Sequence, residues 1–187
     1  MKLFYLDTET TGVQHWRNSV HQISGYIEID GVLKEEFDFN VQPHPKAIIE
    51  TEALEVSGVT EEQIKGYPPQ KTVHAKITKM LDKYVDKFDS KDKFFIVGYN
   101  AIFDVNFFRA FFKQCSDHYY GSYFWSGCLD VMVMALEHLK HERHEMENFK
   151  LKTVASKLGI QVVEENLHDA MYDIELTRDA YKILTNE

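Results

Sequence analysis

Hydrophobic residues near the start of the chain form an unbroken run, Leu3–Leu6, that stops at two carboxylates, Asp7 and Glu9. Because no polar residue interrupts the run, it predicts a strand buried on both faces. Residues two apart on an extended chain point to the same side, so the two acids should face one way. Paired acids repel each other unless a cation neutralises them, and carboxylate oxygens suit Mg²⁺ or Mn²⁺. The same spacing is common on protein surfaces, so a metal site requires further ligands elsewhere in the chain.

Four further strands are expected, at residues 20–29, 32–41, 94–98 and 119–125. The dipeptide Asp30-Gly31 is a typical two-residue hairpin turn, so the strands on either side of it should be antiparallel. The strand at 94–98 again lacks alternation and is expected in the interior of the sheet.

Helical patterns fill the segments between and after these strands. The sequence Thr60–Gln63 has the form of a capping box, and Gly159 has the position of a helix C-cap. Helices are expected at residues 50–56, from 60, 70–88, after 104, and at 129–139, 151–158 and 168–184. An antiparallel trio followed by strand–helix units predicts an α/β fold with a mixed sheet and flanking helices. Without repeats or a linker, residues 1–187 are expected to form one domain.

Composition narrows the functional classes only a little. The formal net charge of −9 argues against a broad basic surface for nucleic acid. It leaves room for an enzyme that holds only the end of a strand through metal ions. Cys115 and Cys128 form neither a metal-binding spacing nor a disulfide framework, which favours a cytoplasmic protein with reduced thiols. No signal peptide, anchor or membrane-length apolar run is expected.

Three more residues are candidate partners for the paired acids. Asp104 follows the fourth strand, and ligand sites of α/β sheets gather at the carboxyl ends of strands. The alternative is a first-turn acid that interacts with the helix dipole. Asp173 shares its side of the last helix with Leu176 and Ala180, which points it toward the core, where a metal would neutralise it. His168 converges with Asp173 only if His168 lies at or before the helix start, because five helical residues turn through roughly 140°.

Taken in order, three segments resemble the motifs of the DEDDh 3′–5′ exonucleases. They are Asp7-Thr-Glu9-Thr-Thr-Gly12, Gly98-Tyr-Asn-Ala-Ile-Phe-Asp104 and His168-x-x-x-x-Asp173. Residues 151–160 also resemble the segment that this family carries between its second and third motifs. The family includes the proofreading subunit of bacterial replicative DNA polymerases, ribonuclease T and oligoribonuclease. The resemblance implies a ribonuclease-H-like fold, with a five-stranded mixed sheet of which three strands are antiparallel.

The resemblance also implies roles for single residues. Two Mg²⁺ or Mn²⁺ ions would be held by Asp7, Glu9, Asp104 and Asp173, with His168 as general base. Substrate contacts are expected from Thr8, Thr10, Thr11, Gly12, Asn100 and Phe103. Phe103 would stack on a terminal base, or else it is a core residue. Tyr99 and Ser57 stand where relatives often carry histidine, which leaves substrate contacts at Tyr99 open. Asp130 is interpreted as a helix-start acid rather than a metal ligand.

Thr8 and Thr10 make the DNA-proofreading branch the nearest in pattern. The predicted activity is hydrolysis from the 3′ end of DNA, in single strands or frayed ends, with release of nucleoside 5′-monophosphates. The alternatives are an RNA-trimming exoribonuclease and a nuclease-fold module recruited to a polymerase complex. A DNA polymerase is the candidate protein partner, although the chain ends soon after its last helix, where a docking tail would be expected. The histidines at 138, 141 and 144 are interpreted as a solvated polar face.

Overall fold

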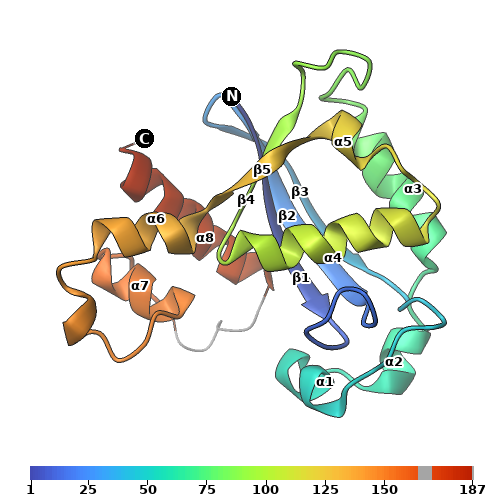
Figure 1. Ribbon diagram of the computed structural model, residues 1–187, viewed down its shortest axis with the longest axis horizontal. Coiled ribbons are helices and arrows are strands. Elements are labelled where there is room, and N and C mark those ends of the chain that lie inside the picture. Colours follow the sequence, from blue (N-terminus) through green and yellow to red (C-terminus); the bar gives the residue numbers. More distant parts are fainter. Residues whose placement is uncertain (164–169, 187) are drawn as a thin grey trace.

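The computed structural model describes residues 1–163 and 170–186. At its centre lies a five-stranded sheet in the order β3-β2-β1-β4-β5 (Figure 1). The strands are β1 (Lys2–Thr10), β2 (Val20–Ile29), β3 (Val32–Asn40), β4 (Phe94–Gly98) and β5 (Phe124–Asp130). β2 pairs antiparallel with both β1 and β3, while β4 pairs in parallel with β1 and β5 in parallel with β4. The expected mixed sheet with three antiparallel strands is therefore confirmed.

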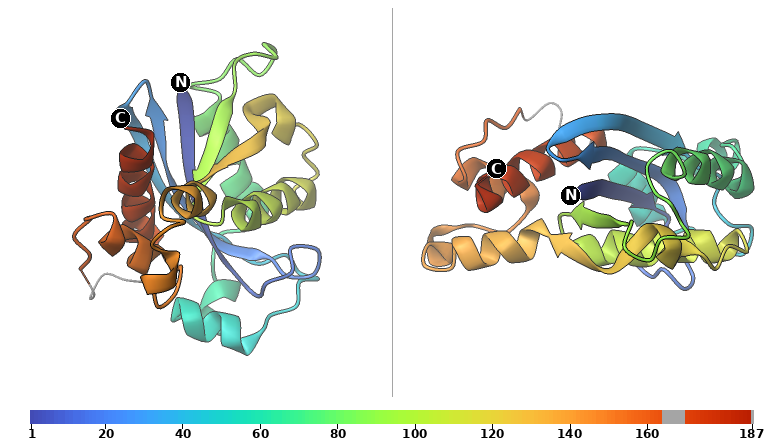
Figure 2. Two further views of the ribbon diagram at one scale, coloured as in Figure 1. Left: turned by 60° about the vertical axis from the view of Figure 1, so that its left-hand side comes forward. Right: turned by 90° about the horizontal axis from the view of Figure 1, so that it is seen from above.

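Helices cover both faces of this sheet (Figure 2). They are α1 (Thr51–Ser57), α2 (Glu61–Lys65), α3 (Gln70–Leu81), α4 (Ala101–Gln114), α5 (Tyr120–Tyr123), α6 (Val131–His138), α7 (Leu151–Lys157) and α8 (Ala170–Thr185), with a 3₁₀ turn at Arg143–Glu145. Phe4 and Leu6 of β1 pack with α3 and α4, whereas Leu3 and Tyr5 pack with α8 on the other face. This is the two-faced burial that the unbroken apolar run predicts. Both α6 and α7 contact α8.

Local turn and capping signals behave as the sequence predicts. Asp30 and Gly31 both have positive φ, 51° and 76°, as a primed two-residue hairpin turn requires. The Thr60 side chain accepts a hydrogen bond from the Gln63 amide, and the Gln63 side chain accepts one from the Thr60 amide, which completes the capping box. Gly159 ends α7 with φ of 83°.

The helix expected over residues 70–88 ends earlier, at Leu81. Beyond it, Asp86 Oδ1 accepts a hydrogen bond from the Phe88 amide, and Asp92 Oδ2 accepts one from the Asp86 amide. Such side-chain acceptors compete with helical hydrogen bonds and favour turns. Phe88 is consequently 89% exposed instead of lying on a buried helix face.

The fifth strand and the helix after it are also displaced from their expected positions. Residues 120–123 form the short helix α5, and the strand runs over 124–130, so Leu129 belongs to β5 rather than to a helix. Phe124 sets this register because its ring packs against Phe4 and Phe108, with centroids 5.2 and 5.7 Å apart. Sequence periodicity does not reveal contacts of this kind between distant residues.

Two further features bear on the sequence-based expectations. Cys115 and Cys128 are both free thiols. In the part of the chain that the structure describes, every helix is too short or too polar to cross a membrane.

Candidate active site

The paired acids lie within β1 rather than after it. The strand continues to Thr10 because β2 pairs with it as far as Val20. By strand alternation, Asp7 and Glu9 share the face of Leu3 and Tyr5, which α8 covers. The two acids therefore lie on one side of the strand, as predicted.

Asp104 lies in the first turn of α4 and is 5% exposed. The chain reaches it through a tight turn after β4, where Asn100 has φ of 60°. Gly98 precedes this turn, and a Cβ there would come within 3.1 Å of the Leu6 carbonyl oxygen. Asp104 Oδ1 accepts two hydrogen bonds from Thr8, one from the amide at 3.0 Å and one from the hydroxyl at 2.7 Å. These contacts hold the first turn of α4 against β1.

Negative charge concentrates around Asp7. Its pKa is raised well above the ordinary range, first by desolvation and then by repulsion from Asp104, Glu9 and Asp173. The pKa of Asp104 is raised to about 7, mainly by burial, although both Thr8 hydrogen bonds act in the opposite direction. Asp173 lies in the first turn of α8. Carboxylates from β1, α4 and α8 are thus close enough to act electrostatically on one residue.

Within residues 1–163 and 170–186, the present arrangement brings no three His, Cys, Asp or Glu side chains close enough together to hold a metal ion. The acids around Asp7 nevertheless offer only carboxylate oxygens, the donors that hard divalent cations prefer. Their mutual repulsion favours uptake of protons or cations. By donor type and charge, these residues fit Mg²⁺ or Mn²⁺. The predicted general base, His168, lies outside the described residues.

Glu9 has a supporting network that sequence reasoning missed. The Ser57 hydroxyl at the end of α1 donates a 2.8 Å hydrogen bond to Glu9 Oε2, and His21 Nε2 lies 3.2 Å from the same hydroxyl. His21 is 1% exposed, and burial lowers its pKa to about 4, so the imidazole is neutral at neutral pH. The pairing of β1 with β2 brings His21 near Glu9, and only a prediction of this pairing could have identified His21 as part of the site.

The threonines expected to contact substrate use their hydroxyls within the protein. Thr8 bonds Asp104, the Thr10 hydroxyl donates to the Gly12 carbonyl oxygen at 2.8 Å, and the Thr11 hydroxyl donates to that of Ile48 at 2.8 Å. Substrate contacts from this segment would therefore come from its backbone. A Cβ at Gly12 would lie 2.4 Å from Asn18 Nδ2, so a larger residue would displace the loop.

The remaining candidates differ in accessibility. Asn100 is exposed, and Phe103 is half-buried with its ring centroid 4.9 Å from that of Phe107.

The Tyr99 hydroxyl donates to the Phe149 carbonyl oxygen at 2.6 Å and so holds the segment before α7. Asp130 caps α6 by accepting a 3.0 Å hydrogen bond from the Met132 amide, as expected for a helix-start acid. The three histidines at 138, 141 and 144 are exposed.

Comparison with known proteins agrees with this arrangement. Residues 4–181 match the exonuclease family RNase_T. The chain is 23% identical to DNA polymerase III subunit epsilon of Pasteurella multocida (strain Pm70), over 96% of this chain and 66% of that protein. It is 32% identical to the PolC-type DNA polymerase III of Streptococcus pyogenes, over 58% of this chain and 7% of that protein. Escherichia coli exonuclease I in complex with a dT13 oligonucleotide has a TM-score of 0.76 and 20% identity, over 98% of this chain and 41% of that one.

The chain therefore belongs to the exonuclease family, and its resemblance to the DEDDh type is confirmed. The match in fold also confirms the expected ribonuclease-H-like architecture. The chain spans 66% or less of the length of each of these proteins.

Proposed function

We propose that this chain is a metal-dependent 3′–5′ exonuclease that hydrolyses DNA from the 3′ end of single strands or frayed ends, releasing nucleoside 5′-monophosphates. The observation that carries the proposal is the gathering of acids around buried Asp7, whose pKa is raised first by burial and then by repulsion from Asp104, Glu9 and Asp173. Concentrated negative charge at the end of a central strand destabilises a fold unless it binds protons or cations. Two bound divalent cations can stabilise both the attacking and the departing oxygen in phosphodiester hydrolysis.

In this proposal Asp7, Glu9, Asp104 and Asp173 hold two divalent cations, Mg²⁺ or Mn²⁺. The cations supply positive charge for the attacking and departing oxygens of the phosphodiester. Thr8 fixes one oxygen of Asp104, which leaves the other for a ligand, and Ser57 orients Glu9. His168, assigned through the family resemblance, takes the proton of the attacking water.

The terminal nucleotide is proposed to lie against Asn100, Phe103 and the backbone of residues 10–12. Phe103 has a half-buried ring beside Asp104, where it can stack on a base. DNA is favoured over RNA because the Thr8 and Thr10 pattern resembles the proofreading branch. The epsilon subunit of P. multocida and the dT13 complex of exonuclease I support the same choice. A DNA polymerase is the proposed protein partner because the chain is similar to the epsilon subunit of a DNA polymerase. The free thiols favour a cytoplasmic location.

Digestion of matched 5′-labelled single-stranded DNA, duplex DNA and RNA tests the proposal. We expect stepwise shortening of single-stranded DNA from its 3′ end, loss of activity in EDTA, and recovery with Mg²⁺ or Mn²⁺. Asp7→Asn should abolish activity, whereas Asp89→Asn, in an exposed turn far from the site, should not. Hydrolysis in EDTA, release of 3′-phosphates or cutting of a closed circle would reject the proposal. A preference for RNA would indicate the exoribonuclease alternative, and binding without hydrolysis the recruited module.

A further inference from the structure

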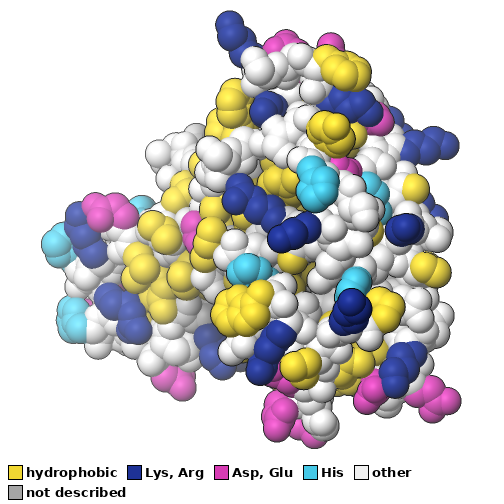
Figure 3. Space-filling view, turned by 45° about the vertical axis from the view of Figure 1, so that its right-hand side comes forward, with side chains coloured by type: hydrophobic (Ala, Val, Ile, Leu, Met, Phe, Trp, Pro, Cys, Tyr) yellow, Lys and Arg dark blue, Asp and Glu magenta, His cyan; other side chains and the backbone are white. Residues whose placement is uncertain are grey.

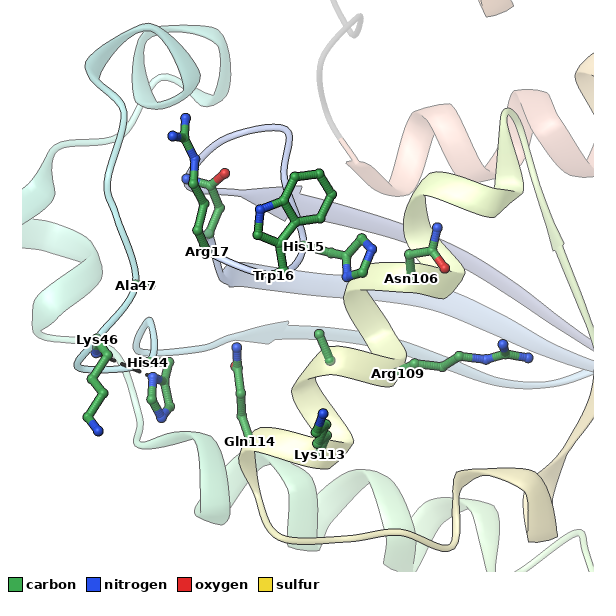
Figure 4. Close-up of a pocket in the computed structure, with 12 residues that line it drawn as sticks. His15, Trp16, Arg17, His44, Lys46, Ala47, Asn106, Arg109, Lys113 and Gln114 are labelled. Carbon is green, nitrogen blue, oxygen red and sulfur yellow. Dashed lines mark hydrogen bonds between the residues drawn. The ribbon is translucent and has the colours of Figure 1, made fainter.

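A hollow of about 650 Å³ lies between the loop at residues 14–18, the segment at 44–47 and the outer side of α4 (Figure 4). We call it the basic groove, and its defining residues are Trp16, Lys46 and Lys113. None of its lining residues is acidic, although the chain carries 30 acidic and only 21 basic residues. In Figure 3, Lys, Arg and His side chains gather over the middle of the face turned forward, and most Asp and Glu side chains lie toward its rim. The groove therefore departs from the acidic character of the chain.

Two lysines supply the accessible charge of this groove. Lys46 and Lys113 stand on opposite walls and are both exposed (Figure 4). Among the described residues, neither lysine forms a salt bridge. The two arginines are already engaged, since Arg17 pairs with Glu50 at 2.5 Å and Arg109 donates to the Ser126 carbonyl oxygen at 3.2 Å. Because the two ammonium groups lie on opposite walls of one hollow, a strand with several phosphates can contact both of them.

Trp16 adds an aromatic surface to the groove. Its side chain is 72% exposed, and the ring of His15 meets it edge-on at 5.2 Å. An exposed aromatic ring beside unpaired lysines is the combination by which proteins bind single-stranded nucleic acid without regard to sequence.

The groove is built on the same elements as the candidate active site. Its loop follows β1, the strand that carries Asp7 and Glu9 and ends at Thr10. The His15 ring lies 6.3 Å from that of Phe107, which in turn packs against Phe103, the neighbour of Asp104. Asn18 holds the loop in place by accepting a hydrogen bond from the Gln14 amide and donating one to the Ile48 carbonyl oxygen, both at 2.9 Å.

We propose that the basic groove binds the nucleotides of single-stranded DNA that precede the 3′-terminal one. Lys46 and Lys113 contact phosphates, and Trp16 stacks on a base. The α4 wall from Asn106 to Lys113 is about 10 Å long at 1.5 Å per residue, which suits about two to three nucleotides. The inference rests on the proposed exonuclease function, because the terminal nucleotide must occupy the site at Asp7 for the preceding ones to reach the groove.

The two tryptophans of the chain allow a direct binding test. In a Trp125→Phe variant, Trp16 is the sole tryptophan, and its fluorescence is followed in EDTA at low salt. We expect (dT)10 to quench this fluorescence, while dTMP and a decaglutamate peptide leave it unchanged. Equal quenching by either of these would assign the groove to a small nucleotide or an acidic peptide and overturn the proposal. Unchanged fluorescence while the anisotropy of labelled (dT)10 rises would show that the strand binds elsewhere.

Charge reversal provides the second test. Affinity for (dT)10 falls with salt, and Lys46→Glu/Lys113→Glu should make this dependence shallower. The negative slope of log affinity against log salt concentration should shrink in magnitude by about 1.4, the value for two single-strand phosphate contacts. Trp16→Ala should weaken binding by about tenfold, as expected for the loss of one base–aromatic stack. The matched control is Lys87→Glu/Lys91→Glu, which changes the net charge equally in the turn before β4 and should leave the slope unaltered. Equal effects of the two double variants would overturn the proposal.

These binding measurements need no turnover. An absence of hydrolysis would therefore count against the proposed function alone, and an unaffected salt slope against the groove alone. Because Trp16, Lys46 and Lys113 are exposed, the variants should fold, which a melting curve checks.

Discussion

The Thr8 hydroxyl donates a 2.7 Å hydrogen bond to Asp104 Oδ1, across 96 residues of sequence. Both residues are buried, and the bond lowers the pKa of a carboxyl group that burial otherwise raises. The same oxygen accepts the Thr8 amide. One residue of the first motif thus orients the acid of the second.

Replacing Thr8 with valine keeps the shape of the side chain and removes only the hydroxyl. Because a hydrogen bond to a charged group contributes about 1.5–3 kcal/mol, we expect turnover to fall by tenfold or more. Thr8→Ser should restore most of it. Turnover on 5′-labelled DNA, with melting temperature as a control for folding, checks this. Wild-type turnover in the valine variant would show that Asp104 needs no such positioning.

Ser57→Ala should weaken metal binding through Glu9, because it removes the 2.8 Å hydrogen bond to Glu9 Oε2. A loss of about 1 kcal/mol corresponds to roughly a fivefold increase in the Mn²⁺ concentration that gives half-maximal activity. Ser126→Ala, at an exposed position on β5, is the matched control. An unchanged Mn²⁺ requirement in Ser57→Ala would mean that Glu9 is oriented without this hydroxyl.

The raised pKa values of Asp7 and Asp104 predict how pH acts on the metal-free protein. The folded protein holds these protons more tightly than the unfolded chain, so the stabilisation present at low pH is lost as pH rises toward about 7. In EDTA, the melting temperature should therefore fall between pH 5 and about 7, and Asp104→Asn should flatten this decline. Mn²⁺ should raise the melting temperature most at the upper end of that range. A decline of equal size in Asp104→Asn would contradict the assignment.

Asp130 joins three elements, since its Oδ1 accepts from the amides of Met132 and Asn100 at 3.0 and 3.1 Å. Asp130→Ala removes a helix N-cap and should lower the free energy of unfolding by about 0.5–2 kcal/mol. Asp130→Asn keeps the acceptor oxygen and should retain most of that stability. Denaturant unfolding of the two variants measures the difference. Equal losses would show that charge, rather than hydrogen bonding, is what Asp130 contributes.

His168→Ala tests the general base. Removal of a positioned acid–base group should cut turnover by about 10²–10⁴ while leaving folding and metal binding intact. The wild-type rate should rise with pH as the imidazole loses its proton, and the variant should lack this rise. Turnover measured across pH, with Mn²⁺-dependent melting as the control, checks both points. Near-wild-type turnover at neutral pH would remove His168 from the proposed mechanism.

Much of this protein is determined within short stretches of its sequence. The unbroken run Leu3–Leu6, the Asp30-Gly31 turn and the Thr60 capping box each depend on residues close together in the chain, and each forms as predicted. The order of the three motifs, with the strands and helices that carry them, was likewise sufficient to identify the family.

Only the tertiary structure decided the features that depend on residues far apart. The register of β5 around Phe124 and the link from His21 through Ser57 to Glu9 both arise from contacts between separate segments. The basic groove joins three segments that no spacing in the sequence connects. The physical reason is that turns and caps are stabilised by neighbouring backbone groups, whereas strand pairing and side-chain networks form only once the chain has packed.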